Sequence, residues 1–483
     1  MYTPLLIVVR RVNLGLAVLY GAIYGALSFS LLCYWVSAYH LLAGITVSLI
    51  YMVFFASLAA LLKLAVILFP KNGYLLQWLL WISFEYLRTK GFLGFSYGIT
   101  GYTQWQNTLL IQIADIFGIW GLSALVLFPS FLLSNLLSNY KIKGTSKNLC
   151  VPLSAFLWFF CLIASFSYGI YKKTDFSSYP QAKIALIQSN SDPNIDTGDD
   201  YRADFKTLSR LSDASLSESP ADLVVWPETA FIPMIYWHQH YRTSDIFYKQ
   251  VKELTDYLAQ KNTPFLIGND DGRRLLTDEG EQVRVDYNAA ILLEGGAITD
   301  VYRKIHLVPF SEHFPYKKQL PFIYALLLKT DTHFWTKGEK YTVFNLNSVK
   351  FASPICFEDT FSEISRNFAN NGAEFFANLS NDAWAHSQTS QMQHLSMAVF
   401  RSVENKRSTV RSTTSGITCA IDPNGKIIAS LEPFTESYIN VSIPLVETKT
   451  FYTKHGDFLP LIAMAVLVII FIVRVVKTTD RFF

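Results

Sequence analysis

The sequence predicts an α/β domain placed between membrane-spanning α-helices. Of the 483 residues, 51% are hydrophobic and only 16% are charged, and the mean hydropathy is +0.24, outside the range of ordinary soluble proteins. The apolar residues are concentrated before about residue 171 and after Phe458. Between these regions, short β-like runs alternate with helical patterns, which is typical of α/β domains.

Six segments are long and apolar enough to cross a hydrocarbon core of about 30 Å. They are expected at 13–37, 42–69, 74–98, 108–139, 149–171 and 459–476. We therefore predict an N-terminal membrane domain at 1–175 with about five helices, a polar domain at 180–448, and a C-terminal membrane helix at 459–476. No small-residue cleavage pattern follows residues 14–32, so we expect the first span to act as its own signal.

Basic residues in the short loops indicate the orientation of these helices. They lie at alternate ends of the spans, as Arg10, Arg11, Lys71, Lys141, Lys143, Lys147, Arg474, Lys477 and Arg481. Such loops tend to stay in the cytoplasm. Five spans that start there place the polar domain on the opposite side, and the sixth span returns the chain, so we predict a multi-pass membrane protein.

Runs of β-branched and aromatic residues predict the strands of the polar domain. They lie at 183–188, 223–226, 265–267, 289–293, 301–303, 349–355 and 374–379, with a hairpin formed by 417–421 and 427–431. Helical patterns lie at 201–212, 246–260, 358–369 and 394–406. This alternation fits either a doubly wound sheet or two packed sheets. The apolar run at 320–328 fits either a core helix or a lid that enters the bilayer.

Three reactive side chains each follow a β-like run. Glu228 follows 222–227, Lys304 follows 301–303, and Cys356 follows 349–355 at a strand-to-helix turn. N–H groups in the first turn of such a helix favour negative charge on a thiol or a nearby oxyanion. A carboxylate, an ammonium and a thiol can divide acyl transfer between a base, an oxyanion partner and a nucleophile. Taken singly, the three residues are more typical of a turn carboxylate, a solvated charge and a core thiol.

Other chemistries have less support. The five cysteines are an odd number and three fall in membrane segments, so we expect free thiols. His238 and His240 lack a nearby carboxylate or cysteine motif, which favours surface histidines over a metal site. The net charge of +3 comes without a basic cluster in the polar domain and gives no support to nucleic-acid binding. Glu85 and Arg88 in an apolar span suggest either a satisfied ion pair or a functional site.

The motifs around the three reactive residues resemble those of carbon–nitrogen hydrolases of the nitrilase superfamily. They are Trp226-Pro227-Glu228, the run from Arg303 to Phe310, and Ile355-Cys356-Phe357-Glu358. With further motifs, the chain resembles the apolipoprotein N-acyltransferase family from residue 81 to residue 457. These include Glu85-Tyr86-Leu87-Arg88, Gly101-Tyr102-Thr103-Gln104, Ser380-Asn381-Asp382-Ala383-Trp384, Gln393-His394 and Arg411.

This resemblance implies a nitrilase-like four-layer αββα sandwich and a ping-pong reaction. Cys356 would take an acyl chain from a phospholipid donor as a thioester and pass it to the α-amine of a diacylated apolipoprotein. Glu228 would be the base, and Lys304 would stabilise the oxyanion. The implied supporting residues are Glu312, Glu358, Asn288 and Asn381, although both asparagines also fit simple turn roles.

The resemblance also implies a bacterial inner-membrane protein whose catalytic domain lies in the periplasm and needs no metal or other cofactor. We expect a monomer that does not bind nucleic acid. Phe357, Ala385 and Thr414 stand where the family usually has Tyr, Phe and Asn, and six spans are expected where the family has eight. The alternative is therefore a membrane-anchored amidase or an acyltransferase for a different amine. A non-enzymatic lipid-binding scaffold is a third hypothesis, and the intact Glu228, Lys304 and Cys356 argue against it.

Overall fold

The computed structural model describes residues 2–139, 150–191, 197–277, 280–329, 332–346 and 348–479. Within it the chain divides into two units, one of residues 1–173 with 454–483 and the other of residues 174–453. Four of the basic residues used for the orientation, Lys141, Lys143, Lys147 and Arg481, lie outside the described residues.

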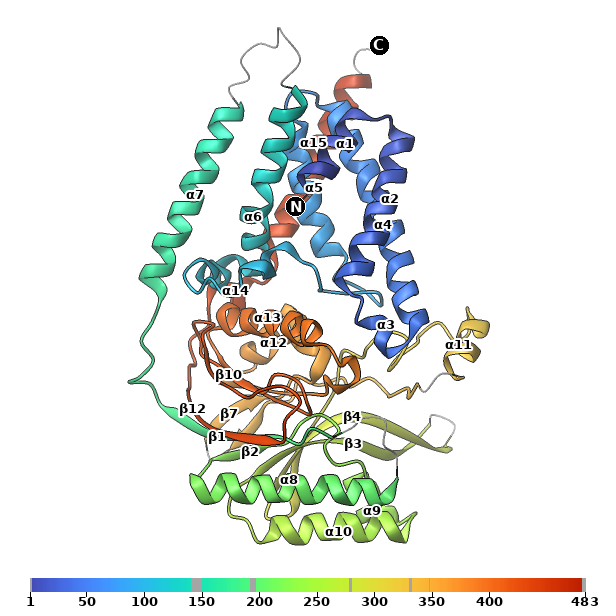
Figure 1. The fold of residues 1–483 in the computed structure, drawn as a ribbon, viewed down its shortest axis with the longest axis vertical. Helices are drawn as coiled ribbons and strands as arrows, with labels where there is room; N and C mark the ends of the chain where they lie inside the picture. Colours follow the sequence, from blue (N-terminus) through green and yellow to red (C-terminus); the bar gives the residue numbers. More distant parts are fainter. Residues whose placement is uncertain are drawn as a thin grey trace. The chain divides into compact units, whose positions relative to one another are not determined.

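The first unit is built from helices (Figure 1). They are α1 (Thr3–Arg11), α2 (Leu14–Leu32), α3 (Val36–Tyr39), α4 (Leu41–Leu68), α5 (Gly73–Leu87), η1 (Thr100–Gln104), η2 (Leu110–Ile113), α6 (Ala114–Asn139), α7 (Cys150–Lys172) and α15 (Phe458–Thr479). Four helical stretches are long and apolar enough to cross a membrane, namely Leu14–Leu32, Leu41–Leu68, Leu110–Ser138 and Cys150–Lys172. The part of α15 from Phe458 to Arg474 is a shorter apolar helix. The unit therefore has the composition of a membrane anchor.

The prediction of one span over 74–98 is wrong, because α5 ends at Leu87. Arg88 closes the helix and folds the following segment back onto it. Its Nη1 donates to the carbonyl oxygens of Phe95 at 3.1 Å and Tyr97 at 2.8 Å, and to the Tyr51 hydroxyl at 2.9 Å. A buried, irregular backbone needs such donors, since its carbonyls have no helical partners.

Glu85 and Arg88, both within the described residues, bind different partners rather than each other. Glu85 Oε1 accepts hydrogen bonds from the Thr100 hydroxyl at 2.6 Å and the Thr100 N–H at 3.1 Å. Of the two alternatives for these residues, the ion pair is therefore wrong, and a functional site stays a prediction. Each charged side chain instead ties α5 to the irregular segment that follows it.

Two six-stranded sheets form the centre of the second unit. One has the order β12-β1-β2-β3-β4-β5 and the other β11-β10-β9-β8-β7-β6. Their strands are β1 (Gln181–Gln188), β2 (Leu223–Val225), β3 (Phe265–Leu276), β4 (Gln282–Glu294), β5 (Ala297–Arg303), β6 (Phe344–Leu346), β7 (Val349–Ala352), β8 (Phe375–Ser380), β9 (Ser408–Thr413), β10 (Cys419–Ile421), β11 (Ile427–Ser430) and β12 (Ser437–Pro444).

Helices cover the outer faces of the two sheets, which confirms the four-layer αββα sandwich (Figure 1). The helices between residues 198 and 455 are α8 (Gly198–Glu218), α9 (Ile235–Tyr241), α10 (Asp245–Ala259), α11 (Pro321–Leu327), η3 (Cys356–Thr360), α12 (Ser362–Asn370), η4 (Ala383–Ala385), α13 (Gln388–Asn405) and α14 (Phe451–His455). α8 and α10 lie on the first sheet, and α12 and α13 on the second (Figure 1).

Apolar burial holds α8 and α10 against the first sheet, and a few buried polar groups fix their position. Phe205 and Leu254 from these helices pack in one core with Trp226 and Ile267. The indole N–H of Trp226 donates to the Ser212 hydroxyl of α8 at 2.9 Å. A buried tryptophan needs such a partner, so this bond sets where α8 crosses β2.

A second set of buried hydroxyls joins the two sheets. The Ser412 hydroxyl of β9 donates to the carbonyl oxygen of Ile187 in β1 at 2.7 Å and to that of Val225 in β2 at 3.1 Å. β9 itself, Ser-Thr-Val-Arg-Ser-Thr, is fully buried although five of its residues are polar. An apolar-run criterion misses such a strand, because hydrogen bonds between the sheets and not apolar area stabilise it.

Several predicted elements have different limits. β3 and β4 extend far beyond 265–267 and 289–293 as a long antiparallel hairpin, whose outer part is exposed. The helix expected at 358–369 is divided into η3 and α12, because Phe361 between them is extended. α11 contains no buried residue, and Phe322 is 70% exposed, so the core-helix interpretation of 320–328 is wrong.

Candidate active site

Strand ends of both sheets bring Glu228, Lys304 and Cys356 together. Glu228 follows β2 and Lys304 follows β5 in the first sheet, whereas Cys356 follows β7 in the second. Lys304 Nζ lies 3.2 Å from Glu228 Oε1, and the Lys304 side chain is completely buried. The charges of Glu228 and Lys304 both act on the Cys356 thiol. The fold thus assembles a buried carboxylate, ammonium and thiol from positions 76 and 128 residues apart along the chain from Glu228.

Both carboxylate oxygens of Glu228 are held. Besides Lys304, Oε1 accepts a hydrogen bond from the Asn288 side chain at 2.9 Å. Oε2 accepts one from the backbone N–H of Asn381 at 2.9 Å, and the Asn381 side chain accepts from Ala383 N–H in its own turn. Asn288 therefore touches the carboxylate with its side chain, whereas Asn381 does so through its backbone.

Gly268 of β3 makes room for Glu228. A Cβ at this position would lie 2.3 Å from the Pro227 carbonyl oxygen and 2.6 Å from Glu228 Cα. Backbone atoms cannot move aside as a side chain can. The next residue, Thr229, has φ of 51°, which is uncommon for a non-glycine residue. The carboxylate of Glu228 therefore belongs to a tight turn that packs closely against β3.

Lys304 lies between two carboxylates. Glu312 Oε1 is 2.8 Å from Lys304 Nζ, and Glu312 Oε2 accepts a hydrogen bond from Val308 N–H at 2.8 Å. Burial lowers the pKa of Lys304, but Glu228 and Glu312 outweigh it and raise that pKa well above its ordinary value. Burial raises the pKa of Glu312, although Lys304 acts in the opposite sense. Lys304 is therefore a fixed cation at neutral pH.

Cys356 has a left-handed backbone, with φ of 48°. Such a conformation is strained for a residue with a Cβ and turns the chain sharply after the extended Ile355. Burial raises the pKa of the Cys356 thiol well above its ordinary value, and Glu228 adds to this while Lys304 opposes it. The sequence allowed negative charge on the sulfur or on a nearby oxyanion; the raised pKa disfavours a resting thiolate, and the oxyanion alternative stays a prediction. The turn leads into the five-residue 3-10 helix η3, and the resting group is a thiol that needs a base.

Glu358 joins the nucleophile turn to the lysine loop. Its Oε1 accepts hydrogen bonds from the Tyr302 hydroxyl at 2.8 Å, Ile305 N–H at 2.7 Å and His306 N–H at 3.0 Å. Its Oε2 accepts one from Ile355 N–H at 2.8 Å. Burial raises the pKa of Glu358 to about 7, even though these donors lower it. Glu358 thus touches the backbone on either side of the site.

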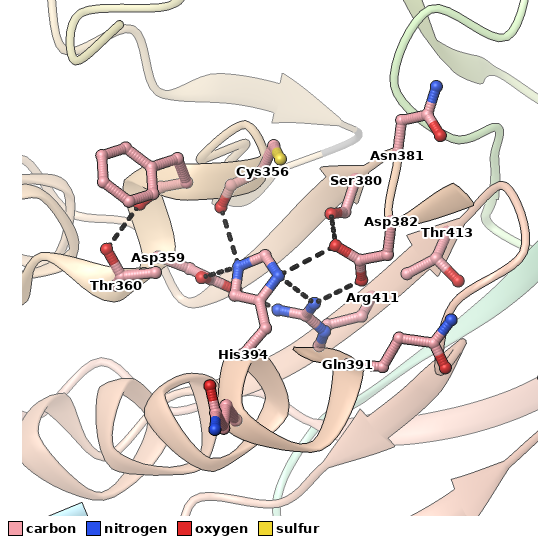
Figure 2. A network of polar contacts seen from close by, with 12 residues as sticks. Cys356, Asp359, Thr360, Ser380, Asn381, Asp382, Gln391, His394, Arg411 and Thr413 are labelled. Carbon is pink, nitrogen blue, oxygen red and sulfur yellow. Dashed lines mark hydrogen bonds and ion pairs between the residues drawn. The ribbon is translucent and has the colours of Figure 1, made fainter. Parts of the chain in front are cut away.

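A buried ion cluster beside Cys356 is not among the site residues that the sequence predicts. It consists of Asp359, Asp382, His394 and Arg411 (Figure 2). Three of these residues stand out in the sequence only as part of motifs that resemble a family. A possible signal is the charge of Arg411 inside the short strand β9, because an ionisable residue in a fully buried strand requires partners.

The three departures from the family pattern all lie in segments of the site. Phe357 is in η3, where its ring is 5.0 Å from that of Phe361. Ala385 is buried in η4, and Thr414 N–H donates to the Ser380 carbonyl oxygen at 3.1 Å. Among the residues that the structure describes, no group of three or more His, Cys, Asp or Glu side chains is arranged to hold a metal ion.

Two family profiles match the chain. Residues 183–452 match the carbon-nitrogen hydrolase family, and residues 1–132 match the N-terminal domain of apolipoprotein N-acyltransferase. The first match covers the sandwich that carries the site, and the second covers most of the helices that precede it.

Curated relatives match nearly the whole chain. Apolipoprotein N-acyltransferase 1 of Treponema denticola is 41% identical, over 96% of this chain and 89% of the relative. Apolipoprotein N-acyltransferase 1 of Treponema pallidum is also 41% identical, over 92% of this chain and 84% of the relative. The apolipoprotein N-acyltransferase of Borreliella burgdorferi is 30% identical, over 97% of this chain and 88% of the relative. Among solved structures, Saccharomyces cerevisiae Nit3 aligns with a TM-score of 0.39 and 20% identity, over 56% of this chain and 93% of that one.

Proposed function

The chain belongs to the apolipoprotein N-acyltransferase family, and on this premise we propose that it transfers an acyl chain from a phospholipid to the N-terminal amine of diacylated lipoproteins. The observation that carries the chemistry is the buried contact of Lys304 with Glu228 beside the Cys356 thiol. An acid–base group, a fixed cation and a nucleophile are the parts that acyl transfer through a covalent intermediate requires.

In the first half-reaction, Glu228 removes the proton from Cys356, and the sulfur attacks the ester carbonyl carbon of the phospholipid. The Lys304 ammonium stabilises the negative charge that develops on the carbonyl oxygen. When the ester C–O bond breaks, Glu228 returns the proton to the leaving oxygen. The products are a lysophospholipid and an acyl thioester on Cys356.

In the second half-reaction, the α-amine of the acceptor's N-terminal cysteine attacks the thioester carbonyl. Lys304 again stabilises the oxyanion while Glu228 removes a proton from the attacking nitrogen. The C–S bond breaks, the proton passes to the Cys356 sulfur, and an amide remains on the acceptor. The same three groups thus serve both steps, with no metal or nucleotide among the reactants.

The protein is membrane-anchored, and we place it in the bacterial inner membrane with several passes and the sandwich in the periplasm. The mature N-terminus of an exported lipoprotein and the outer-leaflet phospholipids are both accessible on that side. Arg10, Arg11 and Lys71 at the ends of the apolar helices support this orientation.

Intact-mass measurement tests the proposal. Purified protein in detergent is incubated with phosphatidylethanolamine, and we expect the mass of one acyl chain to appear on the wild type and on Cys419→Ala but not on Cys356→Ala. Cys419 is a suitable control because it is another buried free thiol in the sandwich. Adding a diacylated lipopeptide with a free N-terminal cysteine should move that mass to the peptide.

The other outcomes identify the alternatives. A thioester that ignores the lipopeptide but is discharged by water or by another amine would favour the amidase or a different acceptor. No adduct with any phospholipid would exclude the phospholipid-donor mechanism.

A further inference from the structure

A buried cluster of two carboxylates and two cations lies directly behind the nucleophile. Asp359 comes from η3, Asp382 from the turn after β8, His394 from α13 and Arg411 from β9, and none of them is more than 4% exposed. Arg411 binds Asp359 through Nη1, and its Nη2 lies 3.6 Å from Asp382 Oδ2. Because the formal charges cancel, the cluster can stay buried as a unit.

His394 is the centre of this cluster (Figure 2). Its Nδ1 lies 3.1 Å from Asp382 Oδ1 and its Nε2 lies 2.7 Å from Asp359 Oδ1. An imidazolium, with hydrogen on both ring nitrogens, satisfies both carboxylates, although the Arg411 Nη2 donor also lies 3.4 Å from Nδ1. Burial and Arg411 lower the pKa of His394, but Asp359 and Asp382 outweigh them and raise it to about 9. These three are the charged groups that face the ring from the packed elements.

The same ring contacts the backbone of the nucleophile. His394 Nε2 lies 3.2 Å from the carbonyl oxygen of Cys356. The left-handed conformation of Cys356 must be imposed by its surroundings. Glu358 holds the chain just before Cys356 through Ile355 N–H, and His394 holds the carbonyl just after the Cα.

The cluster also reaches the base. Asp382 directly follows Asn381, whose N–H donates to Glu228 Oε2. The Ser380 hydroxyl donates to Asp382 Oδ1 at 3.2 Å, so the whole turn after β8 is held by side chains. His394 therefore contacts the nucleophile's backbone directly and is connected to the Glu228 carboxylate through two intervening residues, Asp382 and Asn381.

We propose that His394 is a positioning residue for acyl transfer: it pins the Cys356 carbonyl and, through Asp382, the Asn381 N–H, so that the thiol and Glu228 keep one relative geometry. This inference rests on the proposed function, since it concerns the same two half-reactions. In this role His394 does not contact the substrate. Its replacement should therefore slow the chemical step and leave phospholipid binding unchanged.

The test compares His394→Ala, His394→Gln and the wild type. The glutamine amide can donate near the Nε2 position but carries no charge, and it removes the Nδ1 contact with Asp382 Oδ1. We expect His394→Ala to lower kcat for thioester formation by about 100-fold with KM for the phospholipid little changed, because small displacements of a nucleophile cost this much. The kcat of His394→Gln should lie between those of His394→Ala and the wild type. His240→Gln is the control, because His240 is an exposed histidine on α9.

A pH profile separates positioning from a merely structural role. In the wild type, the rate of thioester formation should fall as the pH rises through about 9, where the imidazolium loses its proton. His394→Gln has no such proton, so its profile should lack that fall. Melting temperatures in detergent identify variants that do not fold. If His394→Ala does not fold, the comparison of His394→Gln with the wild type tests the proposal.

The results distinguish this inference from the function on which it rests. Wild-type protein that forms no thioester would refute the proposed function. Wild-type protein that forms it, together with a folded His394→Gln that has the wild-type kcat or keeps the fall near pH 9, would refute the positioning role. A raised KM with unchanged kcat would refute it as well.

Discussion

Glu358 is the residue through which the nucleophile turn and the lysine loop are held in place. Four donors converge on it, three on Oε1 and one on Oε2, and all belong to backbone or side chains at the two strand ends. These four hydrogen bonds stabilise the negative charge of the carboxylate, whereas the complete burial of Glu358 disfavours that charge. The balance of these effects places its pKa at about 7, so the charge of Glu358 depends on pH near neutrality.

The pH dependence of stability should change in Glu358→Gln. The pKa of Glu358 is about 7 in the folded chain against an ordinary value of 4.5, so the folded state holds the proton more tightly. The contribution of this group is fully present below pH 4.5 and is lost as the pH rises through about 7. The loss is on the order of 3 kcal/mol.

Thermal unfolding in detergent between pH 4.5 and pH 8 checks this. Glutamine does not titrate, so the wild type should lose more melting temperature over this range than Glu358→Gln, which will be less stable overall because its amide N–H₂ cannot accept from every donor. Glu294→Gln, at an exposed position at the end of β4, should follow the wild type. Parallel curves for the wild type and Glu358→Gln would contradict the raised pKa.

At the scale of elements, Gly268 allows strand β3 of the first sheet to approach the turn that carries Glu228. β3 passes so close to the turn of Glu228 that a Cβ on Gly268 would meet three backbone atoms between 2.3 and 2.7 Å away. This close approach places the carboxylate next to Asn288 on the neighbouring strand β4. The position of Glu228 is therefore a property of three adjacent strands rather than of its own turn.

Gly268→Ala should both destabilise the fold and slow the chemistry. Overpacking against backbone costs about 1–3 kcal/mol, and here the relief of the clash displaces Glu228. We expect a lower melting temperature and slower thioester formation. Gly198→Ala is the matched control, since the first residue of α8 has open space around it. A Gly268→Ala protein with wild-type kinetics would show that the turn can shift without moving the base.

In the helical unit, the end of α5 depends on Arg88. Replacing it with leucine leaves two carbonyl oxygens and the Tyr51 hydroxyl without their buried donor, at a cost of about 1–3 kcal/mol for each unsatisfied group. Arg88→Leu should therefore melt well below the wild type in detergent, and Arg88→Lys, which keeps a donor, should lie between them. A wild-type melting temperature for Arg88→Leu would mean that water or lipid replaces the guanidinium.

At the scale of the whole molecule, the sandwich is inserted between two helices of the other unit. The chain leaves the helical unit after α7, which ends at Lys172, and returns to it before α15, which begins at Phe458. If α7 and α15 both span the bilayer, their far ends lie on the side opposite the sandwich. The proposed periplasmic position of the active site then requires a cytoplasmic C-terminus.

Fusions to alkaline phosphatase, which is active only outside the cytoplasm, test this topology. A fusion after Thr174 should be active, whereas fusions after Lys71 and at the C-terminus should be inactive. An immunoblot of each fusion protein is needed to show that it is expressed. Activity after Lys71 would contradict the orientation, and activity at the C-terminus would show that α15 does not cross the membrane.

The sequence by itself determined the class of the molecule and the order of its reactive groups. Long apolar runs indicate lipid-facing helices because residue type and run length are both readable in the sequence. Motif order identifies Glu228, Lys304 and Cys356 as candidates without any geometry. Motif resemblance, confirmed by the relatives, identified the family and its sandwich, whereas strand pattern alone left the sheet arrangement open.

Only the tertiary structure decided the rest, because it depends on contacts between residues far apart in the chain. The polar strand β9, the contact of Arg88 with the Tyr51 hydroxyl and the ion cluster around His394 all depend on hydrogen bonds or ion pairs to distant segments, which no local pattern encodes. The pKa of Cys356 is raised chiefly by burial, an effect that the sequence around a strand-to-helix turn does not encode. Local helix and strand propensity can be read from the sequence. The desolvation of a side chain and its pairing with distant groups arise only when the chain has folded.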